Sequence, residues 1–129
     1  MANLYDLLSN GFPADRDKPA FLLGDGSAVS YGELEAGAAR VAGHLIAEGV
    51  APGDRVGLQA EKSVAGVMVY LGVLKAGGVF LPLNAAYTPA EVDYFRGDAE
   101  PRIFITDPEG FLVEAKDAAP LAAAVARAD

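Results

Sequence analysis

Three short apolar runs, separated by segments with helix signals, occupy the second half of this sequence. Residues 55–60, 79–83 and 103–105 are rich in branched and aromatic side chains and are bounded by turn residues, as β-strands are. Residues 64–75, between the first two runs, are apolar nearly all round, as in a helix surrounded by protein. Strands that alternate with helices favour parallel pairing and right-handed crossovers. The sequence therefore predicts an α/β fold with three layers, a mostly parallel sheet with flanking helices.

A capping box marks the start of a helix before these strands. Ser30 is followed three residues later by Glu33, a pattern in which two side chains satisfy backbone N–H groups at a helix start. Gly49 is placed to end this helix in a left-handed conformation. The apolar residues between them share one helical face; they are Leu34, Ala38, Val41 and Leu45.

A second capping box follows the middle apolar run. It is Thr88-Pro89-Ala90-Glu91, with proline at the first helical position. We expect a helix over residues 89–96 that ends at Gly97. Its apolar side chains, Val92 and Phe95, are expected to face inward.

The ends of the chain carry shorter signals. Residues 1–10 predict a helix with Leu4, Leu7 and Leu8 on one face, followed by a loop. A Gly-Asp-Gly turn between two short runs predicts a β-hairpin. After a turn at Asp107 and Pro108, residues 111–113 are expected to form a short strand. Residues 120–128 are expected to form an alanine-rich helix capped by Asp117.

These elements predict one α/β domain over residues 1–129. Its expected parts are an N-terminal helix and loop (1–19), a β-hairpin (20–31), an alternating α/β core (32–107) and an alanine-rich tail (108–129).

The charge balance excludes several classes of protein. With 18 acidic and 10 basic residues, the net charge is −8, and the basic residues are scattered, so we expect no binding to nucleic acid or anionic membranes. The absence of cysteine and the single histidine, His44, exclude a Cys/His zinc site. The apolar stretch 64–83 is interrupted by Lys75 and Pro82, so it does not predict a membrane span. No secretory signal is visible, and we expect a cytoplasmic protein.

Candidate binding residues follow two neighbouring strands. In open α/β sheets, ligands bind at the carboxyl ends of the strands, where Lys62 follows the first strand and Asn84 and Tyr87 follow the second. Lys62 could hold a phosphate or a carboxylate, although a solvated helix cap is the favoured interpretation. Asn84 is favoured to shape the turn, and Tyr87 to pack against a neighbouring layer.

Signatures of catalysis are missing from these residues. The sequence has no dinucleotide-binding or P-loop glycine pattern and no nucleophile elbow, and His44 makes no convincing triad with the serines. We therefore expect no catalytic residue and no metal ligand in this chain. The residues taken alone predict an α/β domain without a complete active site.

Several linked motifs, in order, resemble the opening of the acyl-CoA synthetases of the adenylate-forming superfamily. They are Tyr-Gly-Glu-Leu at 31–34, Gly-Val-Ala-Pro-Gly-Asp-Arg-Val at 49–56, Leu-Lys-Ala-Gly-Gly-Val at 74–79, Pro-Leu-Asn at 82–84 and Tyr-Thr-Pro-Ala-Glu at 87–91. The resemblance covers residues 20–107. The segments 61–63, 81–84 and 92–95 look most like those of malonyl-CoA synthetases.

The resemblance implies a two-step ligase, either a malonyl-CoA or a fatty-acyl-CoA ligase. ATP and a carboxylic acid, with Mg²⁺, would give an acyl-adenylate and pyrophosphate, and CoA would then take the acyl group as a thioester. It also implies that the phosphate loop, the adenylate-binding motif and the catalytic lysine belong to a later part of such an enzyme. Where some relatives carry a basic residue near the CoA nucleotide, this chain has Ala85 and Ala86.

Two hypotheses follow. The first is the N-terminal scaffold of an acyl-CoA ligase, inactive alone and prone to self-association through an uncovered apolar patch. The alternative is a complete small α/β module that binds a nucleotide or a partner protein at the same strand ends.

Overall fold

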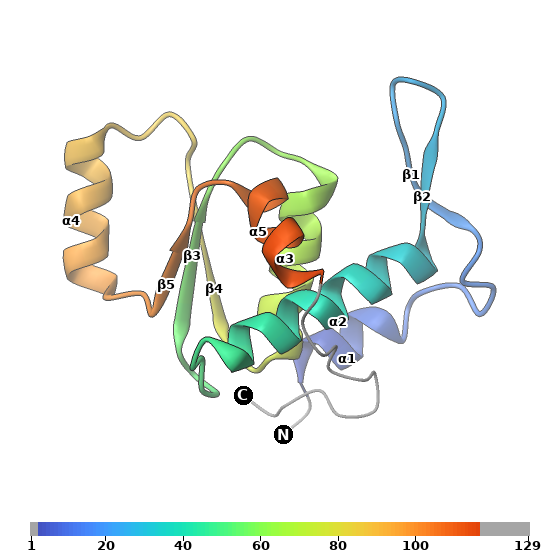
Figure 1. The fold of residues 1–129 in the computed structure, drawn as a ribbon, viewed down its shortest axis with the longest axis horizontal. Helices are drawn as coiled ribbons and strands as arrows, with labels where there is room; N and C mark the ends of the chain where they lie inside the picture. Colours follow the sequence, from blue (N-terminus) through green and yellow to red (C-terminus); the bar gives the residue numbers. More distant parts are fainter. Residues whose placement is uncertain (1–2, 117–129) are drawn as a thin grey trace.

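The central element of the fold is a parallel sheet of three strands. The computed structural model describes residues 3–116 of the chain, and Figure 1 shows their arrangement. The strands are β3 (Arg55–Gln59), β4 (Val79–Leu83) and β5 (Ile103–Ile105), in the order β4-β3-β5. Val56 of the middle strand pairs with Phe80 on one side and Ile103 on the other. The predicted parallel α/β sheet is confirmed.

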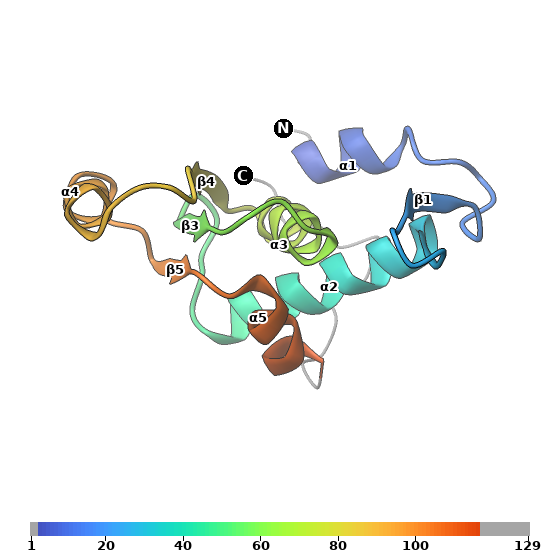
Figure 2. The same cartoon turned by 90° about the horizontal axis from the view of Figure 1, so that it is seen from above.

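Helices cover both faces of this sheet. Helix α3 (Val64–Lys75) joins β3 to β4 on one face, and α4 (Pro89–Ala99) joins β4 to β5 on the other (Figure 2). The two connections move in opposite directions along the sheet, so right-handed crossovers place their helices on opposite faces. Helices α2 (Tyr31–Ala47) and α5 (Pro108–Ala115) pack on the face of α3. Among the described residues, no helix is long and apolar enough to cross a membrane.

The main core lies between the sheet and the helices α2, α3 and α5. Val56 and Leu58 of the middle strand point into it, because alternate residues of a strand face one side. Their helical partners include Val69 and Val73 of α3, both fully buried. The predicted apolar stripe of α2 is buried as a whole. This packing explains why residues 64–75 are apolar nearly all round.

The N-terminal helix α1 (Leu4–Ser9) docks on the body of the molecule through Tyr5. The leucines at 4, 7 and 8 are exposed, and Tyr5 is the buried residue. The reason lies in a contact with the end of α3: Asn3 donates a side-chain hydrogen bond of 2.7 Å to the carbonyl of Leu74, and Lys75 Nζ lies 4.7 Å from the centre of the Tyr5 ring. The predicted helix is confirmed, and a polar and aromatic contact, not its leucine face, decides how it docks.

The β-hairpin projects from the body of the molecule (Figure 1). It consists of β1 (Pro19–Leu22) and β2 (Ala28–Ser30), paired antiparallel, and its Leu22 is 81% exposed. Both side chains of the first capping box make their hydrogen bonds, and the cap residue Ser30 ends β2. Gly49 has φ +96°, as predicted for the end of α2.

Two predictions about the later elements were wrong. Residues 111–113 lie inside helix α5, because Asp107 accepts a hydrogen bond from the backbone N–H of Gly110 and Pro108 occupies the first turn. Helix α4 continues past Gly97 to Ala99 and ends at Glu100, which adopts a left-handed conformation with φ 48°. The side chain of Arg55 binds the carbonyl of Ala99 at 2.8 Å and so holds this longer end.

The side chains expected to face inward from α4 are only half-buried. No residue of α4 is fully buried, and the guanidinium of Arg96 lies 5.0 Å from the centre of the Phe104 ring of β5. The helix predicted for residues 120–128 and its cap at Asp117 lie outside the described residues.

Candidate functional site

The loops after β3 and β4 meet in one groove at the carboxyl ends of the strands. This rim groove has a volume of about 500 Å³. Its lining residues are Ala60, Glu61, Lys62, Pro82, Leu83, Asn84, Ala85 and Ala86. Two of the three candidates from the sequence, Lys62 and Asn84, therefore come together here. The parallel pairing is the cause, since it brings both strand ends to one edge.

Asn84 uses its side chain to shape the loop. Its Oδ1 accepts a hydrogen bond from the N–H of Ala86 at 2.9 Å, and its carbonyl accepts one from the N–H of Tyr87 at 3.0 Å. This is an Asx-type turn, in which the side chain replaces a backbone acceptor. The geometry is the turn-shaping one that the sequence favoured, and its Oδ1 is engaged in the turn.

Gln59, the last residue of β3, holds this loop in place. Its Nε2 donates to the carbonyls of Asn84 and Tyr87, each at 3.2 Å. The two carbonyls bracket the turn, so one side chain fixes the loop against the middle strand. Sequence reasoning did not single out Gln59. The available signal was a polar side chain at the last position of an otherwise buried strand.

Lys62 lies in the exposed loop that leads into α3. The helix itself begins at the next residues, where Ser63 Oγ accepts a hydrogen bond of 3.0 Å from the N–H of Gly66. Lys62 and its neighbour Glu61 both line the rim groove. In so exposed a position, one ammonium group attracts an anion only weakly.

Tyr87 lies outside the rim groove. Its side chain is 42% exposed and borders a separate hollow of about 490 Å³ along α4. The other lining residues of that hollow are Ala90, Glu91, Tyr94, Phe95 and Asp98. The side chain of Tyr87 therefore lines a different hollow from Lys62 and Asn84, although its backbone belongs to the turn of Asn84.

The chemistry available in the rim groove is limited. It offers backbone polar groups, one ammonium group and the carboxylate of Glu61, with small side chains at Ala85 and Ala86. Among residues 3–116, no three His, Cys, Asp or Glu side chains gather closely enough to hold a metal ion. These residues fit a contact with one anionic group and do not fit a Mg²⁺ site. The rim groove can shape and support a site.

A buried lysine lies at the opposite end of α3. Lys75 is 1% exposed, and burial lowers the pKa of its amine, a shift that Asp6 and Glu35 oppose. Its neighbour Tyr5 is 2% exposed, and burial, assisted by Glu35, raises the pKa of the phenol to about 12. Sequence reasoning did not predict this contact. It fastens α1 to α3 far from the rim groove.

Comparison with known proteins identifies a family and several related proteins. The family described as AMP-binding enzyme matches residues 12–129. A medium/long-chain-fatty-acid–CoA/3-oxocholest-4-en-26-oate–CoA ligase of Mycobacterium marinum is 37% identical over 92 residues, which cover 71% of this chain and 16% of that protein. A plipastatin synthase of Bacillus subtilis is 39% identical over 83 residues, covering 64% of this chain and 3% of that protein.

Solved structures give the same result. Apo MatB from Rhodopseudomonas palustris is 44% identical, with a TM-score of 0.76, and the match covers 88% of this chain and 24% of MatB. A benzoate CoA ligase from Burkholderia xenovorans is 26% identical with a TM-score of 0.80, covering 95% of this chain and 30% of the ligase. The chain thus spans less than a third of each of these relatives.

Proposed function

Because this chain belongs to the AMP-binding enzyme family, we propose that it is the N-terminal scaffold of an ATP-dependent acyl-CoA synthetase. Its parallel sheet with flanking helices matches the N-terminal subdomain of adenylate-forming enzymes. The observation that carries the proposal is the 44% identity with MatB over 88% of the chain, together with a TM-score of 0.76. Malonate or a related small carboxylic acid is the substrate we propose, on this likeness and on the motifs at 61–63, 81–84 and 92–95.

The proposed reaction has two steps. A carboxylate oxygen attacks the α-phosphorus of ATP, pyrophosphate leaves, and an acyl-adenylate forms. The sulfur of CoA then attacks the acyl carbon, AMP leaves with the bonding electrons, and the thiol proton passes to solvent. Mg²⁺ would neutralise phosphate charge when bound. We place this chemistry in the cytoplasm, where ATP and CoA are available.

The described residues would support these steps by positioning the loops around the site. Gln59 and Asn84 fix the loop at the end of β4, and Lys62 lines the rim groove, where it could meet one anionic group. Tyr87 borders the neighbouring hollow and would pack against a further part of the enzyme. Reacting groups would come from the remainder of the enzyme.

A second candidate is the adenylation part of a nonribosomal peptide synthetase. Plipastatin synthase, at 39% identity, favours it. Both candidates share the adenylation step and differ in the thiol that receives the acyl group. A complete small binding module is the third possibility, and it predicts no contribution to adenylation.

A chimera tests the scaffold function directly. Residues 20–107 of this chain would replace the matching segment of R. palustris MatB, and exchange between ATP and pyrophosphate would be measured with malonate. We expect the chimera to keep exchange within about tenfold of its parent, and the isolated 129-residue chain to show none. As a matched control, Lys62→Ala in the chimera should change the rate only a few-fold. A folded chimera without exchange, or exchange by the purified chain alone, would contradict the proposal.

A further inference from the structure

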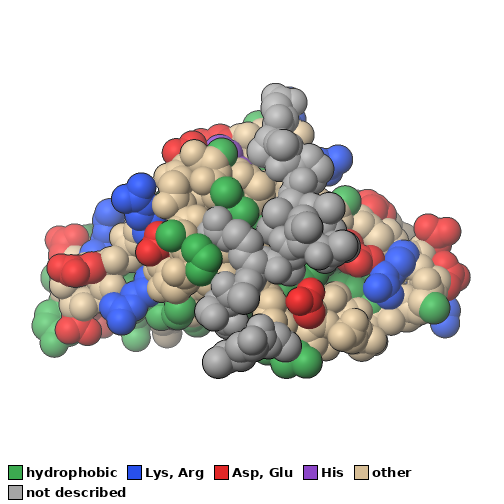
Figure 3. All heavy atoms as spheres, turned by 90° about the horizontal axis from the view of Figure 1, so that it is seen from below, with side chains coloured by type: hydrophobic (Ala, Val, Ile, Leu, Met, Phe, Trp, Pro, Cys, Tyr) green, Lys and Arg blue, Asp and Glu red, His purple; other side chains and the backbone are tan. Residues whose placement is uncertain are grey.

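Among residues 3–116, Lys75 is the one lysine whose amine the fold hides. It is 1% exposed, whereas Lys18, Lys62 and Lys116 are exposed. Figure 3 shows basic side chains, in blue, standing at the surface of one face. Lysine is rarely buried in full, because its ammonium group loses its hydration. A buried lysine needs a cover and a partner, and helix α1 supplies both.

Helix α1 covers this amine through two residues. Tyr5 places the centre of its ring 4.7 Å from Lys75 Nζ, a cation–π contact. Asn3 donates to the carbonyl of Leu74 at 2.7 Å and accepts a hydrogen bond of 2.7 Å from the N–H of Tyr5. Within residues 3–116, α3 is the element against which α1 chiefly packs (Figure 2). Release of these few contacts is therefore enough to uncover Lys75.

The hold of α1 on α3 is weak. The helix has six residues, too few to persist by itself in water, and its leucines are exposed. Docking buries an ammonium group, and none of the ion pairs within residues 3–116 includes Lys75. Burial accordingly lowers the pKa of this amine, a shift that Asp6 and Glu35 oppose. Segments with so few buried contacts open locally while the rest of the chain stays folded.

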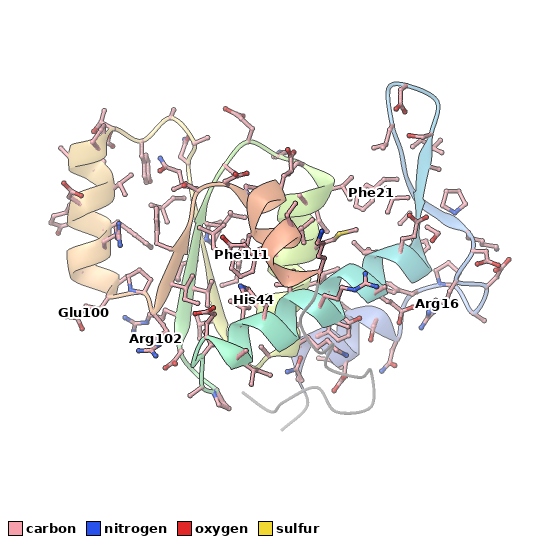
Figure 4. The ribbon with its side chains drawn as sticks, in the orientation of Figure 1. Arg16, Phe21, His44, Glu100, Arg102 and Phe111 are labelled. Carbon is pink, nitrogen blue, oxygen red and sulfur yellow. The ribbon has the colours of Figure 1, made fainter. Side chains whose placement is uncertain are left out.

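The loop after α1 is anchored separately, at the start of α2. The ring of Phe12 lies 5.0 Å from that of Tyr31. Arg16 forms an ion pair of 2.5 Å with Glu35, and its carbonyl accepts a hydrogen bond of 2.8 Å from the N–H of Gly32. Figure 4 shows Arg16 beside the N-terminal end of α2. Helix α1 can therefore leave α3 while this loop stays in place.

We propose that α1 is a detachable strap and that Lys75, the amine beneath it, is an acylation site whose modification keeps the strap off α3. When the strap is open, the neutral amine attacks the carbonyl carbon of an activated acyl group, such as a thioester. An amide bond forms, the carbon–sulfur bond breaks, the thiolate leaves with the bonding electrons, and the nitrogen loses a proton to solvent. Any activated acyl donor would serve, so the site does not depend on the proposed ligase function.

Acylation removes the group on which the strap docks. The amide carries no charge, so the cation–π contact with Tyr5 is lost. The acyl group also adds volume at a fully buried position, where extra atoms force packed groups apart. A permanent fastening, which opens only when the whole chain unfolds, is the competing explanation.

Acetylation of the 129-residue chain with N-succinimidyl acetate tests the site, with mass spectrometry at each lysine. In the wild type we expect Lys75 to react in the folded chain, at least about tenfold more slowly than the exposed lysines. Tyr5→Ala should raise the Lys75 rate about tenfold, through loss of the ring contact, and leave the other rates nearly unchanged. Tyr5→Phe is the matched control, because it keeps the aromatic ring and should react as the wild type does.

Amide exchange tests the strap without a substitution. In the wild type the hydrogen-bonded N–H groups of Tyr5 and Asn10 should exchange at least about tenfold faster than those of Val79 and Arg102 at the sheet. They should exchange faster still once Lys75 is acetylated. The matched control is an early time point, at which only the exposed amines carry acetyl groups. Protected sheet amides show in every sample that the chain stays folded.

Four results would overturn the proposal. In the acetylation experiment these are a Lys75 rate that Tyr5→Ala does not change, and a wild-type Lys75 rate equal to that of the exposed lysines. In the exchange experiment they are α1 amides that exchange no faster than the sheet amides, and α1 exchange that stays the same after Lys75 is acetylated.

Discussion

Single side chains at the strand ends and at the C-terminal end of α3 hold neighbouring segments together. Gln59 binds two carbonyls of one loop, and Lys75 and Tyr5 share a buried contact between two helices. Each joins segments far apart in the sequence. Their contributions to stability differ, because the Gln59 hydrogen bonds are exposed to solvent and the Lys75 contact is buried.

Replacing Gln59 by Leu tests its hold on the loop. Leu keeps the size but loses both hydrogen bonds, so we expect faster amide exchange at Tyr87 and a loss of about 0.5–1.5 kcal/mol in unfolding free energy. Asn84→Ala is the comparison, since it removes the turn bond to Ala86 and keeps the Gln59 bonds to backbone carbonyls. Unchanged exchange in the Gln59 variant would show that the loop is held by other contacts.

The phenol of Tyr5 predicts a loss of stability at high pH. Its pKa is about 12 in the folded chain and 10.0 when unperturbed, so the folded state retains a proton that the unfolded state loses. The unfolding free energy should therefore fall between pH 10 and 12. The lowered pKa of Lys75 acts with opposite sign, raising stability as pH rises toward 10.5, and contributes nothing further above it.

Urea unfolding from pH 9 to 12 measures this effect. Tyr5→Phe should reduce the alkaline loss, and Tyr94→Phe, at a position that is 78% exposed, should leave it as in the wild type. Identical pH profiles for Tyr5→Phe and the wild type would refute the role of this phenol.

Among the elements, the pair α2 and α3 packs most closely. A Cβ on Gly72 of α3 would lie 2.3 Å from Cγ1 of Val41 in α2, so the two helices touch where α3 has no side chain. Helix α4 is the opposite case: it has no fully buried residue, and a Cβ on Gly97 would meet nothing within 4 Å. Glycine therefore allows close helix packing in α3, whereas in α4 it only lowers the helix propensity.

Two alanine substitutions should accordingly act in opposite directions. Gly72→Ala should cost about 1–3 kcal/mol of unfolding free energy, because the packed helices must separate. Gly97→Ala should raise it by up to about 1 kcal/mol, through helix propensity alone. Chemical denaturation of both variants measures the two changes in unfolding free energy. An unchanged unfolding free energy in Gly72→Ala would mean that α2 and α3 can move apart without loss of stability.

At the scale of the whole molecule, one apolar surface stands out. A groove of about 540 Å³ runs along α3, between β1 and β4. Its apolar walls are Phe21, Leu58, Ala60, Val64, Val67, Tyr70 and Phe80, and its polar residues gather at the loop before α3. Apolar surface of this kind often marks an interface. In the proposed enzyme this α3 groove would be covered by further chain.

We therefore expect the isolated chain to self-associate through the α3 groove. Burial of ~400 Å² of apolar surface offers about 10 kcal/mol before association costs, which exceeds the screened repulsion expected of a charge of −8. Sedimentation at micromolar concentration measures it. Val64→Glu, in the groove, should weaken association, and Val113→Glu, on exposed α5, should not. A concentration-independent monomer would contradict this expectation.

Local patterns in the sequence determined the order of the elements as far as β5, both capping boxes, the parallel sheet and the family. These features depend on residues within about four positions of each other, or on the two-residue and 3.6-residue periods of strands and helices. A parallel sheet brings the loops after β3 and β4 to the same edge. The sequence was therefore enough to predict that Lys62 and Asn84 lie at one edge.

Only the tertiary structure decided which distant groups meet. Tyr5 is the buried residue of α1 because Lys75 lies over its ring and Leu74 accepts a hydrogen bond from Asn3, both some 70 positions away. The apolar run 111–113 by itself fits a strand equally well. The cap at Asp107 makes it helical, and Phe111 then packs beside His44 of α2. The order of the strands in the described sheet, β4-β3-β5, is likewise a tertiary feature that no local pattern encodes.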